Sequence, residues 1–186
     1  MMRTTFSMGL AAIALLAGLH AARAQNATPL GLWQATDDDT KQPSGWFLIG
    51  ERDGLYNGII AKMFLKPGED PNAPCDKCKD DRHNHPWLGL EIIRGMKQNG
   101  DKYEDGTILD PRDGSVYRAS MRVSPDGQTL IVRGFIGFAL LGQNQYWSRL
   151  PETAYSQLDP AINPNPASIA KPGARKPDVP HNAAQR

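Results

Sequence analysis

The residues best suited to chemistry are two cysteines and two histidines within one short stretch. Cys75 and Cys78 are separated by two residues, and His83 and His85 follow them. Four nitrogen or sulfur ligands would suit tetrahedral zinc, but two cysteines in an oxidising compartment usually form a disulfide. A redox Cys-x-x-Cys needs a thiol of lowered pKa at a helix start, and the flanks show no such pattern. We therefore predict a structural disulfide and no metal, and keep a metal-handling or redox role of this loop as an alternative.

The cysteines lie in residues 66–86, an irregular stretch with four prolines. Irregular stretches of this length within a domain are usually functional or mobile. Closing so short a disulfide ring removes about 2 kcal/mol of unfolded-state chain entropy. The bond is thus expected to fix the loop locally rather than to hold the domain together.

The acidic and hydroxyl residues give no support for an enzyme. The Asp37–Asp39 run lacks the glycine-bearing ligand loop that follows it in a calcium site. Asp110 and Asp113 flank a turn, where aspartate commonly accepts hydrogen bonds from the nearby backbone. Neither Ser115 nor Ser120 has a histidine partner in a recognisable motif. We predict no catalytic residue, no enzymatic activity and no cofactor.

The first 24 residues have the form of an export signal. Arg3 supplies a positive charge, Met8 to Leu19 is apolar, and Ala22-Arg23-Ala24 has small residues at the spacing of a cleavage site. The apolar run is too short to span a bilayer. The sequence predicts a signal peptide cut after Ala24 and a periplasmic or secreted protein that does not span the membrane.

The charge of the remaining chain argues against a nucleic-acid partner. The whole chain has 21 basic and 20 acidic residues, and removal of Arg3 and Arg23 leaves 21 − 2 = 19 basic residues. Phosphate binding requires clustered lysine and arginine, which a nearly neutral chain does not indicate. The remaining partners are a small apolar or anionic ligand or another envelope protein. The oligomeric state is left open.

Residues 151–186 differ in composition from the rest. They contain seven prolines and few large apolar side chains. Such a segment buries too little apolar area to offset its chain entropy, so we predict a disordered tail. The single folded domain is expected at residues 25–150.

The middle of the chain alternates short apolar runs with tight turns. Asp53-Gly54 is typical of a type I′ hairpin, and Ser124-Pro125-Asp126-Gly127 separates two further runs that are rich in β-branched residues. About eight such runs are present, without helical periodicity. This pattern predicts an all-β fold, a single antiparallel barrel.

Alternation predicts which side chains point inward. In residues 115–123 one face is apolar, with Tyr117, Ala119, Met121 and Val123, and the other is mainly polar, with Val116, Arg118, Ser120 and Arg122. Arg94 and Arg133 fall in register with apolar neighbours, so each is expected inside, beside a protein carboxylate or an anionic ligand group. An ion pair within the protein, or a different register, is the alternative. The predicted lining of a binding cavity is Leu48, Ile60, Ile92, Tyr117, Met121, Ile131 and Phe135.

A set of short motifs resembles one known family. They are Gly31-Leu32-Trp33, Asp53-Gly54 with Tyr56-x-Gly58-x-Ile60, Cys75-x-x-Cys78, Pro86-x-x-Gly89-Leu90, Gly106-x-Ile108-x-Asp110-Pro111, Gly114-x-x-Tyr117, Leu130-x-Val132-Arg133-Gly134, Gly142 and Trp147-x-Arg149. The set is similar to the exported bacterial domain of unknown function 2147. This resemblance implies a lipocalin-like barrel and no catalytic residue. It also implies that Arg149 packs over the Trp33 indole, a structural cation–π contact of about 0.5–2 kcal/mol.

The hypothesis that these observations favour is an exported lipocalin-like protein that binds a small, partly apolar molecule. Tyr117, Met121 and Phe135 would contact the ligand, with Arg94 or Arg133 as a polar anchor. An open interior is required, because a filled barrel would leave no room for the ligand. The alternatives are a structural or protein-interaction module of the cell envelope, and the metal-handling or redox protein named above.

Overall fold

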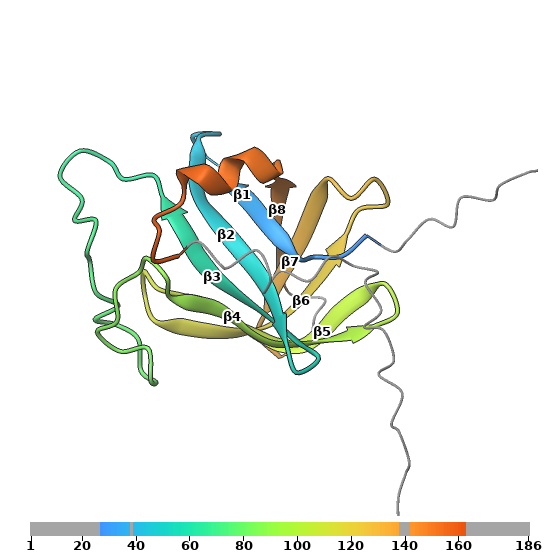
Figure 1. Ribbon diagram of the computed structural model, residues 1–186. Coiled ribbons are helices and arrows are strands. Elements are labelled where there is room, and N and C mark those ends of the chain that lie inside the picture. The colour runs from blue at the N-terminus through green and yellow to red at the C-terminus, as the bar shows by residue number, and fades with distance from the viewer. Residues whose placement is uncertain (1–26, 38, 138–141, 163–186) are drawn as a thin grey trace, which may run out of the picture.

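Eight antiparallel strands form a closed barrel, which confirms the predicted fold class (Figure 1). The computed structural model describes residues 27–37, 39–137 and 142–162. The predicted signal peptide, and its cut after Ala24, lie outside the described residues. In chain order the elements are β1 (Gly31–Thr36), β2 (Pro43–Arg52), β3 (Leu55–Met63), β4 (Glu91–Asn99), β5 (Lys102–Asp110), β6 (Ser115–Val123), β7 (Thr129–Phe135), β8 (Gln143–Arg149) and the 3-10 helix η2 (Glu152–Gln157).

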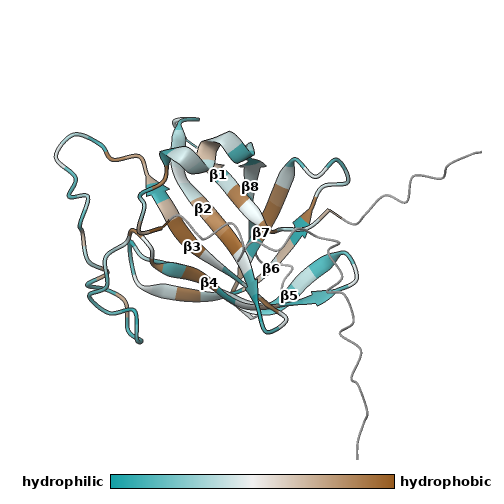
Figure 2. Ribbon diagram, viewed as in Figure 1, coloured by the Kyte–Doolittle hydropathy of each residue, from teal (hydrophilic) through white to brown (hydrophobic). Residues whose placement is uncertain are grey.

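Each strand pairs with its neighbours in sequence, and β8 returns to β1. The connections β2–β3, β4–β5 and β6–β7 therefore meet at one end of the barrel, together with residues 27–30; we call this end the bottom. The other end, where β1, β3, β5 and β7 end and β2, β4, β6 and β8 begin, is the mouth. Apolar residues concentrate in the strands, whereas the turns and the long β3–β4 connection are largely polar (Figure 2).

The β2–β3 hairpin has the predicted turn. Asp53 and Gly54 both have positive φ, at 56° and 77°. A type I′ turn needs this conformation at both central residues, because its twist matches that of the flanking strands. The turn sets Arg52 opposite Leu55, and the pairing continues from there along both strands.

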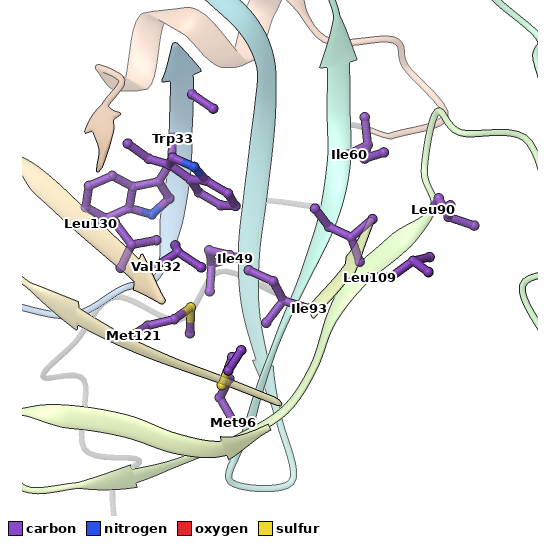
Figure 3. Packing of buried hydrophobic residues seen from close by; sticks show 14 of the residues in the cluster. Trp33, Ile49, Ile60, Leu90, Ile93, Met96, Leu109, Met121, Leu130 and Val132 are labelled. Carbon is purple, nitrogen blue, oxygen red and sulfur yellow. The ribbon is translucent and has the colours of Figure 1, made fainter. Parts of the chain in front are cut away.

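The centre of the barrel is filled by its own side chains (Figure 3). Trp33, Ile49, Ile93, Leu130 and Val132 are at most 1% exposed. In the same cluster Phe47 stacks on Trp147, with ring centroids 4.2 Å apart. Atoms with so little accessible surface border no water-sized void, so the part of the interior that these five side chains occupy offers no room for a ligand.

The alternation predicted for β6 is confirmed. Ala119 and Met121 are buried, whereas Val116, Arg118 and Arg122 are exposed. Residues paired across an antiparallel ladder share a face of the sheet. Met121 lies opposite Val132 and Tyr117 lies opposite Ile108, so these pairs point to the interior.

The predicted faces of β7 were wrong. Arg133 lies opposite Ser120 and Phe135 lies opposite Arg118, so both point to the outside, and Ile131 does too, opposite Arg122. Leu130 and Val132 point inward instead. Both faces of this strand carry apolar residues, so alternation alone did not distinguish them, and a shift of one residue exchanges the faces.

The 3-10 helix η2 covers an apolar patch on the outside of β1–β3. Ala154 and Leu158 pack there with Leu32, Trp46, Leu48 and Ala61. Two predictions are corrected by this packing. Leu48 lies under η2 and not in the interior, and the domain continues to residue 162 instead of ending at 150. The rest of the predicted tail, residues 163–186, lies outside the described residues.

Arg149 closes the barrel bottom. Its guanidinium donates hydrogen bonds to three backbone carbonyls: Nε to Gly127 (2.6 Å), Nη1 to Leu30 (2.8 Å) and Nη2 to Thr28 (2.6 Å). Its Cζ lies 4.0 Å from the centroid of the Trp33 ring. The Trp33 indole in turn donates to the Pro29 carbonyl at 2.7 Å. Burial lowers the pKa of Arg149, and the guanidinium remains charged at neutral pH.

We predict that Arg149→Met lowers the free energy of unfolding by about 3 kcal/mol or more, because three carbonyls lose a charged donor. Urea denaturation followed by tryptophan fluorescence measures the change. Arg122→Met is the matched control: Arg122 is exposed, and its loss should cost less than about 0.5 kcal/mol. Equal stability of the two variants would contradict this role of Arg149.

Candidate functional site

The disulfide Cys75–Cys78 is present in the β3–β4 connection. Both cysteines are buried, at 0% and 2% exposure, and belong to the same apolar cluster as the barrel core. The backbone around the bond folds back on itself: Cys75 N donates to His85 O at 2.8 Å, and Asn84 N donates to Cys75 O at 3.0 Å. We call residues 73–90 the disulfide loop.

The disulfide loop is attached to the β5–β6 turn at the barrel mouth. Lys77 Nζ donates to Arg112 O at 3.1 Å, and Cys75 Sγ lies 3.7 Å from Pro111 O. Gly114 has a φ of 74°, and a Cβ there would overlap the Lys77 carbonyl. The close approach of the two segments therefore requires glycine at this position.

A buried arginine attaches the same loop to β4. Arg82 is 4% exposed; its Nε donates to the Asp80 carboxylate at 3.0 Å and its Nη1 to Glu91 O at 3.0 Å. The hydrogen bonds from Arg82 lower the pKa of Asp80 to about 2. Asp80 thus stays ionised at neutral pH, and the buried charge of Arg82 is compensated.

Arg94 forms a second ion-pair group on the outside of the barrel. Its Nη1 and Nη2 donate to the two oxygens of Asp81 at 2.7 and 2.9 Å, and its Nε donates to Glu91 at 2.6 Å. Hydrogen bonding to Asp81 raises the pKa of Arg94. Arg94 lies opposite Thr107, which lies opposite the exposed Arg118, so the expectation of an inward arginine is corrected. The alternative, an ion pair within the protein, is confirmed.

The two histidines do not assemble a metal centre in this structure. His83 Nδ1 lies 2.8 Å from Cys78 O, while His85 is exposed on the loop. Within residues 27–37, 39–137 and 142–162, no three His, Cys, Asp or Glu side chains come together in a way that could hold a metal ion.

Two clefts flank the disulfide loop. The first, the loop cleft, has a volume of about 310 Å³ and is lined by Asp81, Arg82, His85, Pro86, Leu88, Gly89, Leu90, Glu91 and Arg94. Its two arginines are paired with carboxylates of the same region, so its charges are satisfied internally. The indole N–H of the neighbouring Trp87 is buried without a hydrogen-bond partner among the described residues.

The second cleft, the mouth cleft, is larger, at about 490 Å³. It lies between the disulfide loop, the start of β6 and the end of β7, and is lined by Lys79, Asp80, Gly114, Ser115, Val116, Tyr117 and Ile136. Val116 and Ile136 are 48% and 74% exposed. The wall of this cleft thus combines exposed apolar side chains with a few polar groups.

The ligand-contacting residues that the sequence predicted do not converge. Tyr117 lines the mouth cleft and Arg94 lines the loop cleft. Met121 is 2% exposed inside the filled core, and Arg133 and Phe135 point outward. Sequence reasoning missed Lys79, Asp80 and Ile136, because nothing in the linear sequence places the disulfide loop beside β6.

The barrel fold has a counterpart among solved structures. The barrel resembles the solved structure of protein HP1028 from the human pathogen Helicobacter pylori, described as belonging to the lipocalin family. The similarity has a TM-score of 0.61 at 14% identity and covers 72% of this chain and 91% of that chain. A comparison with curated proteins finds no match.

The family is shown by sequence. Residues 31–149, more than half of the chain, match the family described as uncharacterized protein conserved in bacteria (DUF2147). The chain therefore belongs to that family, as the resemblance of its motifs indicated. None of the helices in the described residues has the length and hydrophobicity needed to cross a membrane.

We predict that Cys75→Ala/Cys78→Ala lowers the free energy of unfolding by about 2 kcal/mol, the entropy of a short ring, and leaves the barrel folded. Urea denaturation measures the stability, and far-UV circular dichroism reports the barrel. In the unmodified protein, an intact mass two hydrogens below the reduced value reports the bond. Loss of the whole fold in the variant would contradict a purely local role.

We further predict an acid transition in the disulfide loop. The pKa of Asp80 is lowered to about 2, so its stabilising effect is complete above the unfolded value of 3.8 and is lost as the pH falls through 2. Asp80 is 39% exposed, and after discounting for solvent screening we expect about 1 kcal/mol. Hydrogen exchange of loop amides between pH 5 and pH 2 measures this effect.

Asp80→Asn should remove most of that pH dependence. Asp76→Asn is the control, because Asp76 is an exposed carboxylate of the same loop. An unchanged pH profile in Asp80→Asn would contradict the assignment.

Proposed function

We propose that this chain is a non-catalytic, exported binding protein that takes a small, partly apolar molecule in the mouth cleft. The observation that carries the proposal is the exposure of Val116 and Ile136 on the wall of a cleft of about 490 Å³. Cleft volumes of about 300–1,000 Å³ are typical of small-molecule sites, and burial of exposed apolar side chains would drive binding.

Because the centre of the barrel is packed, we place the proposed binding site at its rim. A ligand in the interior would have to displace side chains such as Trp33, Ile93 and Val132, which are at most 1% exposed. Opening a core of this density would cost several kcal/mol for each large side chain removed from its contacts. At the mouth, by contrast, Tyr117 is only partly buried, so its ring is accessible from the cleft.

The polar lining favours a ligand with one anionic or hydrogen-bond-accepting group. The Asp80 carboxylate is already bound by Arg82, whereas the exposed Lys79 forms no ion pair among the described residues. Lys79 is therefore the charged donor available to a ligand, beside the apolar surface of Val116 and Ile136. A carboxylate or sulfonate on an apolar body has this chemistry.

Export is supported by the sequence of residues 1–24 and by the presence of a disulfide. Disulfides form and persist in oxidising compartments such as the periplasm. The same bond argues against the metal-handling or redox alternative, since thiolates are the form of cysteine that binds metals or attacks a substrate.

The second candidate is a structural or protein-interaction module of the envelope. The filled barrel centre favours it, because a protein without an interior cavity interacts through its outer surface. Phe64 and Leu65, 39% and 42% exposed after β3, are apolar side chains that a protein partner would cover.

The test is binding of 1-anilinonaphthalene-8-sulfonate, an apolar molecule with one anionic group, to the protein as processed by the cell. We predict that Ile136→Ser weakens binding about tenfold, the effect of removing one buried aliphatic side chain. Leu55→Ser is the matched control: Leu55 is 36% exposed on the β2–β3 hairpin at the barrel bottom, and its loss should leave the affinity unchanged.

Native mass spectrometry of the protein purified from the periplasmic fraction gives a second readout. Additional mass that is lost on denaturation would identify the natural ligand. A bare polypeptide, together with equal dye affinity of Ile136→Ser and Leu55→Ser, would reject the mouth cleft as a ligand site and favour the interaction module.

A further inference from the structure

The outside of β6, β7 and β8 carries positively charged side chains and no negatively charged ones. The three strands contain no aspartate or glutamate, although the chain has 20 acidic residues in all. Their outward positions contain Arg118, Arg122 and Arg133 together with Ile131, Phe135 and Tyr146. We call these six residues the arginine face.

The strand register places cations and apolar side chains next to one another on this face. Arg118 lies opposite Phe135, with its Cζ 5.6 Å from the ring centroid. Arg122 lies opposite Ile131, which lies opposite Tyr146 on the next strand. Tyr146 is 61% exposed, so this part of the face is open to solvent.

The arginines of this face differ from the other arginines near the clefts. Arg82, Arg94 and Arg112 each form an ion pair with a carboxylate. In the described part of the chain, neither Arg118 nor Arg122 has a carboxylate within 4.0 Å. Arg133, the third arginine of the face, donates to Asn144 Oδ1 at 2.7 Å.

The neighbouring outer surface is charge-balanced. On β4 and β5, Lys97 lies 4.0 Å from Asp105, and Lys102 lies 4.0 Å from Glu104. Strands β6–β8 contain basic residues and no acidic one, which gives the nearly neutral chain a cationic surface there.

We propose that the arginine face docks the protein on the surface of a membrane that contains anionic lipids. This inference goes beyond ligand binding in the mouth cleft and rests on different residues. The guanidinium fork matches phosphate oxygens, and a tyrosine ring is suited to the boundary between headgroups and acyl chains. The aliphatic stems of the arginines pack on apolar neighbours while their charged ends reach the headgroups.

The shape of the face favours a lipid surface over an acidic protein segment. The arginine face is the convex outside of a sheet, and the mouth and loop clefts lie beside the disulfide loop instead. An extended peptide needs a groove or an unpaired strand edge, and β6 and β7, which contain the three arginines, are paired on both sides. A fluid headgroup layer adapts to a convex surface. Arg118 and Arg122 are four residues apart on β6, a distance of about 13 Å, so they can reach separate headgroups.

The test is co-sedimentation of the processed protein with phospholipid vesicles, after its N-terminus has been verified by mass. Vesicles of phosphatidylcholine with 30% phosphatidylglycerol should bind it, and vesicles of phosphatidylcholine alone should not. Binding should fall steeply at about 1 M salt, where the screening length is about 3 Å. Equal binding to the two kinds of vesicle, or to neither, would overturn the proposal.

Two double variants distinguish the effect of the arginine face on vesicle binding from the effect of net charge. Arg118→Gln/Arg122→Gln should weaken vesicle binding roughly tenfold to thirtyfold, because each surface cation contributes about fivefold. Arg52→Gln/Lys97→Gln is the matched control, since it removes two positive charges that are 76% and 64% exposed on β2 and β4. This control should bind within about twofold of the unmodified protein.

Two further outcomes would overturn the proposal. Equal loss of binding in the two paired variants would mean that net charge alone acts. Binding to soluble poly-glutamate that depends on Arg118 and Arg122, without binding to anionic vesicles, would assign the face to an acidic protein.

Discussion

Closure of the barrel depends on the hydrogen bonds that Arg149 donates at the barrel bottom. The β1–β8 seam has only two register pairs, Trp33 with Arg149 and Gln34 with Ser148, whereas β7 and β8 share six. So short a ladder would leave the edges of both strands poorly held. The Arg149 side chain compensates by binding the carbonyls of Thr28, Leu30 and Gly127, which belong to the N-terminal segment and the β6–β7 turn. One guanidinium thus joins both ends of the sheet.

Closure at the bottom determines how the interior is used. Trp33 is held under Arg149, side chains from every strand join it in one cluster, and Phe47 stacks on Trp147 within that cluster. An eight-stranded barrel has room either for its own side chains or for one small ligand. This chain uses the space for side chains, so exposed apolar surface is found at the rim and on the outer face instead. The lipocalin-like fold therefore does not by itself place a ligand in the centre.

The disulfide loop gives the rim its shape. Its position depends on three local attachments: Lys77 to Arg112, Arg82 to Glu91, and the close approach at Gly114. The covalent bond restrains the loop internally, while the hydrogen bonds and ion pairs attach it to β4 and the β5–β6 turn. The four-residue disulfide ring contributes little chain entropy, so the position of the loop beside both clefts depends mainly on the hydrogen bonds and ion pairs.

Much of the architecture was determined by local sequence, because it depends on residues close together in the chain. Asp53-Gly54 specified its hairpin through positive φ, and the Cys75–Cys78 spacing made the disulfide the favoured interpretation. The inward face of β6 could also be predicted from the sequence, since only one of its faces is apolar. In β7 both faces carry apolar residues, and only pairing with β6 decided that Val132 points in and Arg133 points out. Tertiary structure alone brought Lys79 beside Ile136, because contacts between residues so far apart in the chain depend on how the barrel closes.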